Sequence, residues 1–283
     1  MKIIWVLENI KKDNSFYSKL NILLLLSSVT LWKKHYPEDN CVFYCDQLTY
    51  TLFKNLDILK LWNEVIIIEQ EYKINREVFW AASKVEVLAK QNEEVILMDH
   101  DTLVFKPIKK FLGNKVTVTN LENGYGYYPT AIDPYVKKLS YKPRWQPASL
   151  NVSFLHLPFP SFTKKYTELS LKIMEELTQL EAPNAKYLIF AEQLLLRHLL
   201  DSDKIPYQCI LKDIWDCDNW KWNGITDKGL FKFPESELTF KHYGPLKDFV
   251  LTSKGGQNYK HDINLLENCI NLPNLDLSSI DKK

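Results

Sequence analysis

Four large apolar residues in a row, Val95-Ile96-Leu97-Met98, are followed at once by two acids, Asp99 and Asp101. A short apolar run with β-branched members is typical of a strand that is buried on both faces of a parallel sheet. Acids directly after such a run indicate that the strand reaches solvent at its carboxyl end, where α/β sheets bind their ligands. We therefore expect the chemistry of this chain to begin where this strand stops.

The two acids are separated by a single residue, His100. Because side chains alternate along a strand, Asp99 and Asp101 are expected to project to the same side. Paired carboxylates at the open end of an α/β sheet suit Mg²⁺ or Mn²⁺, whose other positions can be filled by water and substrate phosphates. The alternative is a solvated pair of surface acids. The apolar run before the pair and the strand-like residues 102–105 after it favour the metal site.

Size and charge limit the function classes. The chain has 283 residues, 46% of them hydrophobic, which is enough for one large α/β domain, or a domain with an appended subdomain, with a substantial core. Lys and Arg number 36 against 35 Asp and Glu, giving a formal net charge of +1. Such a balance creates no global field for nucleic acid or for an anionic membrane. A phosphate ligand must therefore be bound by local groups.

The compartment is predicted from the first residues, the apolar runs and the cysteines. Residues 1–7 are too short an apolar segment for a secretory signal and are expected to form a strand. The longest apolar run, residues 20–32, is interrupted by polar residues and is too short to cross a bilayer. No C-x-x-C pair and no zinc spacing occurs among the five cysteines, so free thiols are expected. These features favour a soluble cytoplasmic protein without a transmembrane segment, in which the Asn151-Val152-Ser153 sequon is accidental.

The first third of the chain alternates strands with helices. Strands are expected at residues 1–7, 41–45, 65–68 and 95–98, and helices at residues 15–34, 48–56 and 74–91. Asp46 follows the second of these strands. This order predicts a mainly parallel central sheet with right-handed crossovers and flanking helices.

The rest of the chain mixes strands, helices and irregular segments. Further strands are expected at residues 115–119, 150–157, 209–211 and 239–242, and helices at residues 160–180 and 185–200. Residues 124–147, rich in Gly, Tyr and Pro, and the aromatic residues 216–228 are expected to be irregular. The polar end of the chain is expected to pack loosely. We predict one catalytic domain over residues 1–250 and a tail over residues 251–283.

Four short motifs follow one another along more than half of the chain. They are Ser83-Lys84-Val85 with Asp99-His100-Asp101, Asn151-Val152-Ser153, Glu192-Gln193, and His242-Tyr243-Gly244-Pro245-Leu246-Lys247. Together they resemble the retaining GT-A glycosyltransferases of the glycogenin and bacterial lipopolysaccharide galactosyltransferase type. The sequence departs from that pattern in four ways: the family's glycine is absent after Val152, Glu192 replaces an aspartate, the segment from His242 to Lys247 is short, and no base-recognition motif follows Val6.

This resemblance implies a GT-A-like α/β fold with an irregular acceptor-side region, and a metal-dependent enzyme. That enzyme would move a sugar from a nucleotide-diphosphate donor, with a UDP-sugar expected, to a glycan or glycolipid acceptor in polysaccharide biosynthesis. Retention of anomeric configuration is a family expectation. Without a transmembrane segment, any membrane association is expected to be peripheral. The implied residues are Asp99, Asp101 and His242 for Mn²⁺ or Mg²⁺, Lys84, Asn151, Gly244 and Lys247 for the donor, and Glu192 and Gln193 for catalysis. For Lys84 the alternative is a solvent-facing lysine, for Glu192 a helix-facing acid without a catalytic role, and for His242 a structural histidine.

Two other functions are compatible with parts of the pattern. Haloacid-dehalogenase-type phosphatases also place two acids after an apolar strand, but their pair lies near the N-terminus and a later Gly-Asp-containing motif is needed. No such motif occurs here. A degenerate glycosyltransferase fold could bind a nucleotide sugar or a glycan without transferring it. The presence of both acids together with His242 and Lys247 argues against degeneration.

Overall fold

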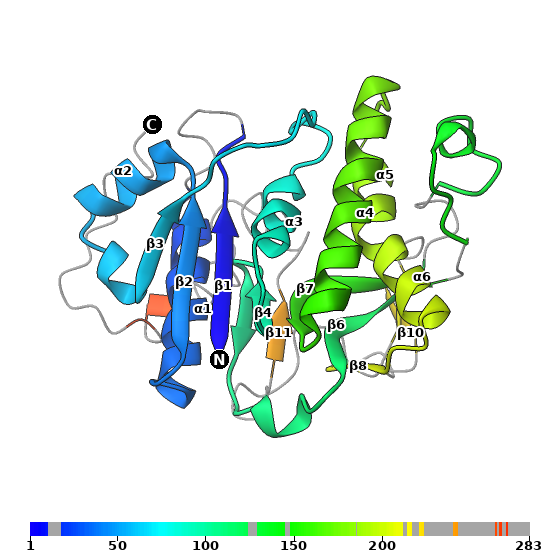
Figure 1. The fold of residues 1–283 in the computed structure, drawn as a ribbon. Helices are drawn as coiled ribbons and strands as arrows, with labels where there is room; N and C mark the ends of the chain where they lie inside the picture. Colours follow the sequence, from blue (N-terminus) through cyan, green and yellow to red (C-terminus); the bar gives the residue numbers. More distant parts are fainter. Residues whose placement is uncertain are drawn as a thin grey trace. The chain divides into compact units, whose positions relative to one another are not determined.

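The structure, a computed structural model, describes residues 1–10, 18–123, 129–144, 148–184, 186–211, 214–216, 221–223, 240–242, 264, 266–267 and 270. The chain clusters into two compact units. Unit 1 comprises residues 1–67, 98–111 and 233–283, and unit 2 comprises residues 68–97 and 112–232. Figure 1 shows the ribbon, coloured along the sequence.

Unit 1 is built on three parallel strands that are joined by helices. The strands lie in the order β1 (Lys2–Leu7), β2 (Asn40–Cys45) and β3 (Glu64–Ile67), and α1 (Lys19–His35), α2 (Gln47–Asn55) and the 3-10 turn η2 (Leu59–Leu61) connect them. All residues of β1 after Lys2 and all residues of β2 after Asn40 are buried. Burial on both faces explains why the sequence shows continuous apolar runs here. The predicted alternation of strand and helix is confirmed in this part of the chain.

Helix α1 is fixed to unit 1 by serine hydroxyl groups. Ser18 caps its first turn by accepting a hydrogen bond from the Asn21 N–H at 3.2 Å. Ser28 Oγ accepts from Trp5 Nε1 at 2.9 Å and donates to the Thr102 carbonyl at 2.7 Å. The second contact holds β5 (Thr102–Val104), which pairs antiparallel with β11 (Phe240–His242) in a two-stranded sheet. One buried hydroxyl thus connects α1 with strands of both sheets in this unit.

The described residues of the predicted tail also contact α1. Ser27 Oγ donates to the Leu266 carbonyl at 3.3 Å, and Lys19 forms an ion pair with Glu267 at 2.8 Å. Leu266 and Ile270 are buried. The prediction of a loosely packed tail otherwise concerns residues outside the described ranges.

Unit 2 contains a mixed sheet. Its strands lie in the order β10 (Lys221–Asn223), β9 (Ile214–Asp216), β6 (Val116–Asn123), β7 (Ala148–Leu157) and β4 (Val95–Met98), and β8 (Tyr207–Cys209) also pairs with β6. Strand β6 runs parallel to β8 and β9 and antiparallel to β7, and β10 is antiparallel to β9. The predicted α/β class with a mainly parallel sheet and flanking helices is confirmed. Strand β10 and the last residue of β9 lie in residues 216–228, which were predicted to be irregular.

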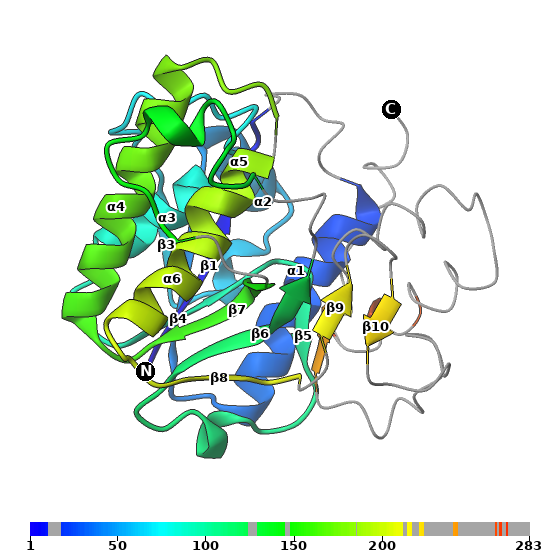
Figure 2. The same cartoon turned by 90° about the vertical axis from the view of Figure 1, so that its right-hand side faces the viewer.

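The helices of unit 2 pack against one another and against β7. They are α3 (Ala82–Ala89), α4 (Pro160–Gln179), α5 (Lys186–Ile189), the π-helix η5 (Phe190–Leu194) and α6 (Leu195–Ser202). Short 3-10 turns occur at η4 (Val136–Lys138) in this unit and at η3 (Lys109–Phe111) in unit 1. Helix α4 contacts α3, η5 and α6, and η5 and α6 contact β7. Figure 2 shows α4 running alongside α6. Within the described parts of the chain, no helix combines the length and apolar character that a bilayer crossing requires.

The predicted helix at residues 74–91 is wrong in its first half, because α3 begins only at Ala82. Asn75 forms local turns in place of a helix: its Oδ1 accepts from the N–H groups of Glu77 at 3.1 Å and Val78 at 3.4 Å. Its own N–H donates to Thr178 Oγ1 on α4 at 3.0 Å. Side-chain bonds of this kind offer the backbone an alternative to helical hydrogen bonds, and the apolar periodicity of the segment does not reveal them.

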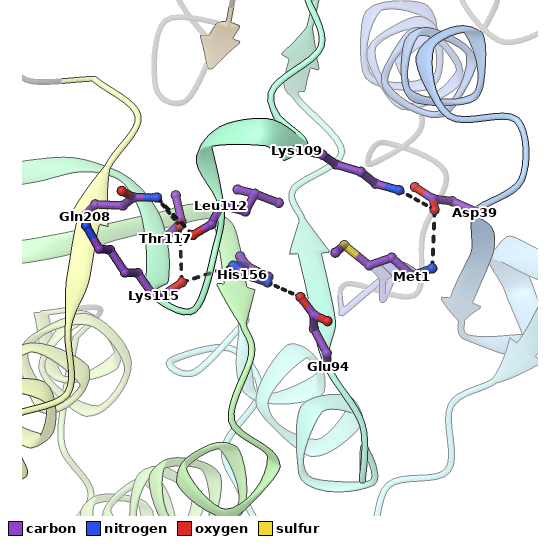
Figure 3. A network of polar contacts seen from close by, with 9 residues as sticks. All are labelled: Met1, Asp39, Glu94, Lys109, Leu112, Lys115, Thr117, His156 and Gln208. Carbon is purple, nitrogen blue, oxygen red and sulfur yellow. Dashed lines mark hydrogen bonds and ion pairs between the residues drawn. The ribbon is translucent and has the colours of Figure 1, made fainter.

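Buried polar contacts tie the strands of each unit to their surroundings (Figure 3). In unit 2, His156 on β7 has no exposed surface, and its two ring nitrogens contact Glu94 Oε1 at 2.7 Å and the Lys115 carbonyl at 3.1 Å. In unit 1, the buried carboxylate of Asp39 accepts from Trp32 Nε1 at 3.0 Å and forms an ion pair with Lys109. Both groups are held by their own unit and serve its structure.

Candidate functional site

The first candidate group lies in unit 1, where β4 ends. Asp99, His100 and Asp101 form a turn that is closed by a hydrogen bond from the Thr102 N–H to the Asp99 carbonyl at 3.1 Å. Asp101 is 3% exposed, and Asp99 is partly exposed. The expectation that the acids follow a buried strand is confirmed. Strand alternation does not apply to this pair, because the strand ends at Met98 and a turn carries the two carboxylates.

The backbone of His242 lies beside this turn. In the antiparallel pair of β5 and β11, His242 stands opposite Thr102, which directly follows Asp101. Residues that face each other in an antiparallel pair have Cα atoms about 4.5–5.5 Å apart. The strand pairing thus brings the segment of His242 next to the segment of Asp101, although the two are far apart in the sequence. A metal site made from the two acids and this histidine requires such proximity. The side chain of His242 and all of Gly244 and Lys247 lie outside the described residues.

The chemistry of these donors fits a hard divalent cation. Two carboxylates and an imidazole, completed by phosphate oxygens and water, suit Mn²⁺ or Mg²⁺. Among the side chains that the structure describes, no group of three or more His, Cys, Asp or Glu residues is arranged to hold a metal ion. His242, the third ligand that the sequence predicts, has its side chain outside the described residues.

The second candidate group lies in unit 2, at a bulge between β6 and β7. The register shifts so that Thr119 of β6 faces three residues of β7, Val152 to Phe154. Thr119 Oγ1 accepts from the Phe154 N–H at 2.9 Å, and Asn151 Oδ1 accepts from the Ser153 N–H at 3.0 Å. These side chains replace the ladder bonds that the bulge interrupts. Bulges often lie beside functional sites, where they direct a side chain, and here the bulge fixes Asn151.

Glu192 and Gln193 lie on the π-helix η5, also in unit 2. Buried hydroxyls of α4 bind the carbonyls of this turn: Ser170 Oγ donates to Ala191 O at 2.8 Å, and Tyr166 Oη donates to Glu192 O at 3.2 Å. Burial, and after it the charge of Glu192, raises the pKa of Tyr166. Single π-turns inside helices are frequent at functional sites. The sequence predicted one continuous helix at residues 185–200, and this π-turn is a correction to that prediction.

The structure connects Gln193 with the strand that carries Asn151. Ser149 Oγ donates to Gln193 Oε1 at 3.3 Å, and Ser149 lies two residues before Asn151 on β7, so both point to the same face. Glu192 is 5% exposed, whereas Gln193 is partly exposed. Lys84 lies on α3 with a partly exposed side chain.

Sequence reasoning missed Glu122 and Ser149. Glu122 Oε1 accepts from Asn151 Nδ2 at 2.6 Å, and Glu122 stands opposite Ser149 in the β6–β7 pair. Neither residue belongs to a recognisable motif, and their proximity to Asn151 follows from strand register alone. Asp46, which the sequence places at the end of a strand, is a helix cap: it accepts from the N–H groups of Leu48 at 2.8 Å and Thr49 at 3.0 Å.

The described part of the loop before β7, residues 129–144, is fastened to three helices of unit 2. Asp133 binds Tyr187 and Lys186 of α5, Ser140 binds Glu176 of α4, and the Tyr141 hydroxyl lies 2.9 Å from His198 Nε2 of α6. Burial acts to raise the pKa of Asp133, but hydrogen bonds from Lys186 and from backbone N–H groups outweigh it and lower that pKa. The loop is therefore held in place against α4, α5 and α6.

The contacts of His198 predict a loss of stability in mild acid. Its Nδ1 accepts a hydrogen bond from the Arg144 N–H at 3.3 Å, as a neutral ring can. Burial of the ring, and after it the positive charge of Arg144, lowers the pKa of His198, although the charges of Asp201 and Asp203 act to raise it. Between the lowered folded pKa and the unfolded value near 6.5, the unfolded chain binds more protons. Stability should thus fall as the pH drops below about 6.5, by at most about 1.4 kcal/mol per pH unit.

Urea unfolding at pH 7 and pH 5.5 checks this prediction. The variant His198→Gln keeps a side-chain acceptor but cannot titrate, so its free energy of unfolding should depend less on pH than that of the wild type. The neighbouring charges of Lys165, Asp201 and Asp203 remain in both proteins. Equal pH slopes in the two proteins would contradict the prediction.

Comparison with known families identifies the group to which the chain is related. Residues 4–247 match the model of a family of unknown function, DUF6734. The chain belongs to this family. Comparison with curated proteins finds no match.

Several solved structures are similar to this DUF6734 protein. The PaToxG glycosyltransferase has a TM-score of 0.41 and 13% identity over 71% of this chain and 68% of that one. The galactosyltransferase LgtC, solved with donor and acceptor sugar analogs, has a TM-score of 0.36 and 10% identity over 68% and 70% of the two chains. A nucleoside-diphosphate-sugar pyrophosphorylase from Vibrio cholerae RC9 has a TM-score of 0.41 and 12% identity over 77% and 93%.

Proposed function

We propose that this DUF6734 protein is a metal-dependent glycosyltransferase that moves a sugar from a nucleotide-diphosphate donor to a glycan or glycolipid acceptor. The observation that carries the proposal is the register of β5 and β11, which places the backbone of His242 opposite Thr102, next to Asp101. The sequence resemblance named the same three residues, Asp99, Asp101 and His242, as metal ligands. Agreement between the motif and a long-range strand pairing supports the assignment.

The residues of the turn would bind the diphosphate end of the donor. Asp99, Asp101 and His242 would hold Mn²⁺ or Mg²⁺, which when bound supplies positive charge to neutralise the diphosphate leaving group. Lys247 would bind a phosphate oxygen by a charge-assisted hydrogen bond, and Gly244 would let the backbone approach the phosphates closely. Lys84 is the remaining cation that we assign to the donor.

The residues around η5 and β7 would bind the sugar. Asn151 would contact sugar hydroxyls, and Gln193 would lie near the anomeric carbon. Glu192 would stabilise the positive charge that develops on the ring as the glycosidic bond breaks, in an enzyme that retains anomeric configuration. We assign a UDP-sugar as donor, a cytoplasmic location, peripheral association with membranes and a role in polysaccharide biosynthesis.

A thermal-shift panel tests the proposal. UDP-glucose, UDP-galactose, UDP-N-acetylglucosamine and GDP-mannose are each added with Mn²⁺, with Mg²⁺ or with a chelator. A ligand at about 100 times its Kd stabilises the native state by about 2.7 kcal/mol, which corresponds to a rise in Tm of several degrees. We expect such a rise for at least one donor, and only when the metal is present. If no donor raises Tm, or if the rise persists with the chelator, the proposal is wrong.

A second measurement separates a transferase from a binding module. The donor that raises Tm most is incubated with the protein and Mn²⁺, and release of the nucleoside diphosphate is followed over time. A transferase is expected to hydrolyse its donor slowly when water takes the place of the acceptor. Binding without any release over hours would favour the degenerate, binding-only fold. Activity on simple phosphate esters with Mg²⁺ would favour a phosphatase.

A further inference from the structure

The amide of Asn151 is fixed at both ends. Its Nδ2 donates to Glu122 Oε1 at 2.6 Å, and its Oδ1 accepts from the Ser153 N–H at 3.0 Å. A carboxylate only accepts and a backbone N–H only donates, so these partners define which end of the amide is nitrogen. Asn151 is 9% exposed, which confines the side chain further.

The bulge makes the oxygen of Asn151 structural. Thr119 of β6 faces three residues of β7, and the N–H of Ser153 takes Asn151 Oδ1 as its acceptor. Thr119 Oγ1 is likewise committed, to the Phe154 N–H at 2.9 Å and Ser153 Oγ at 2.7 Å. The part of Asn151 that is suited to ligand recognition is therefore its nitrogen. This nitrogen carries two N–H groups, one of which donates to Glu122.

Glu122 lies close to the strand position that contacts Gln193, one of the two proposed catalytic residues. It stands opposite Ser149, whose hydroxyl donates to Gln193 Oε1 at 3.3 Å. Ser149 and Asn151 are two residues apart on β7, so their side chains share one face of the sheet. A negatively charged acceptor is stronger than a neutral one and holds its donor in a narrower geometry.

We infer that Glu122 is a positioning residue for sugar recognition. Its carboxylate holds the Asn151 amide so that the second Nδ2–H is presented to a hydroxyl oxygen of the donor sugar. This inference rests on the proposed function and deepens it. It assigns a role to a residue outside every sequence motif and concerns the sugar of the donor, not its diphosphate.

The test compares binding of a nucleotide with and without its sugar. Calorimetry in Mn²⁺ gives Kd for UDP and for UDP-galactose, or for the corresponding pair from the panel. The Kd for UDP divided by the Kd for UDP-galactose reports the contribution of the sugar. Glu122→Ala is expected to lower this ratio by roughly tenfold, the effect of losing a hydrogen bond to a charged group, with Kd for UDP unchanged. Glu122→Gln keeps an acceptor oxygen and should recover most of the ratio.

Glu71→Gln is the matched control. It removes the same charge from another part of unit 2, where Glu71 is half exposed and pairs with Lys90 at 2.8 Å. We expect wild-type Kd values for both ligands in this variant. Urea unfolding of all variants verifies that they are folded under the binding conditions.

Each outcome has a separate meaning. An unchanged ratio in Glu122→Ala overturns the positioning role while leaving the proposed function intact. Equal losses in Glu122→Ala and Glu122→Gln also overturn it, because Glu122→Gln keeps an acceptor oxygen for the Asn151 amide and should then preserve part of the contribution of the sugar. If the wild type binds neither UDP nor any nucleotide sugar, the proposed function itself fails, and the inference fails with it.

Discussion

Replacing Asp101 with asparagine is expected to abolish the metal-dependent binding of a nucleotide sugar. Asp101 is 3% exposed in the turn that follows β4, and asparagine matches its size while removing the charge that a hard cation needs. Loss of a supporting group around a metal ligand already lowers metal affinity by about 10–100-fold, so loss of a ligand should cost at least about a hundredfold. Coupling between metal and donor is reciprocal, so donor affinity should fall with it.

Calorimetric titration with Mn²⁺, followed by the donor, measures both affinities in this variant. Asp99→Asn, at a partly exposed position, provides a second variant that is less disturbing to the core and should show the same loss. The control is Asp57→Asn, which lies in the same unit with a side chain that is 81% exposed and paired with Lys60 at the surface. Wild-type Mn²⁺ affinity in both Asp99→Asn and Asp101→Asn would refute the metal site.

The buried strands of unit 1 could be predicted because their signal is local. Continuous apolar runs of four to six residues, such as those in β1 and β2, arise whenever a strand is covered on both faces. The acids at the end of β4 were found for the same reason, since the change from apolar to acidic residues marks the end of the strand. What lies within a few residues of such a change can be inferred from the sequence alone.

The departure of β5 from the course of β4 could not be predicted. Thr102 to Val104 have the composition of a strand that continues β4, and their actual partner is β11, near the other end of the chain. Strand partners are set by tertiary packing, here including the hydrogen bond from Ser28 to the Thr102 carbonyl. No local pattern encodes such a pairing. The same holds for Glu122, which strand register brings beside Asn151.

The π-turn was hidden by the regular apolar spacing around it. Leu188, Leu195 and Leu199 are buried as an ordinary amphipathic helix would bury them, so periodicity predicts one helix through the segment. The inserted turn is stabilised from outside, by the hydroxyls of Tyr166 and Ser170 on α4. The sequence therefore predicts that Glu192 and Gln193 lie in a helical segment, but it does not predict the π-turn that carries them.

The double variant Tyr166→Phe, Ser170→Ala is expected to cost both stability and activity. Both residues are fully buried, and each lost hydroxyl takes a donor from a buried carbonyl of η5, at about 1–3 kcal/mol per group. If the turn then relaxes to an α-helix, the residues on either side rotate relative to each other by about 100°. Such a rotation would take Gln193 away from Ser149, and donor turnover should fall by at least about a hundredfold.

Thr167→Val provides the matched control for this variant. Thr167 lies on the same helix and is equally buried, but its hydroxyl donates to the Thr163 carbonyl of α4 itself, at 2.9 Å, and not to η5. The free energy of unfolding is measured in urea. The release of nucleoside diphosphate from the donor is measured at a temperature well below Tm, where all variants are folded. The control should keep wild-type turnover even where it loses some stability. If the double variant is destabilised yet turns over its donor at the wild-type rate, the geometry of the π-turn is unimportant for catalysis, and Glu192 and Gln193 lose their assigned roles.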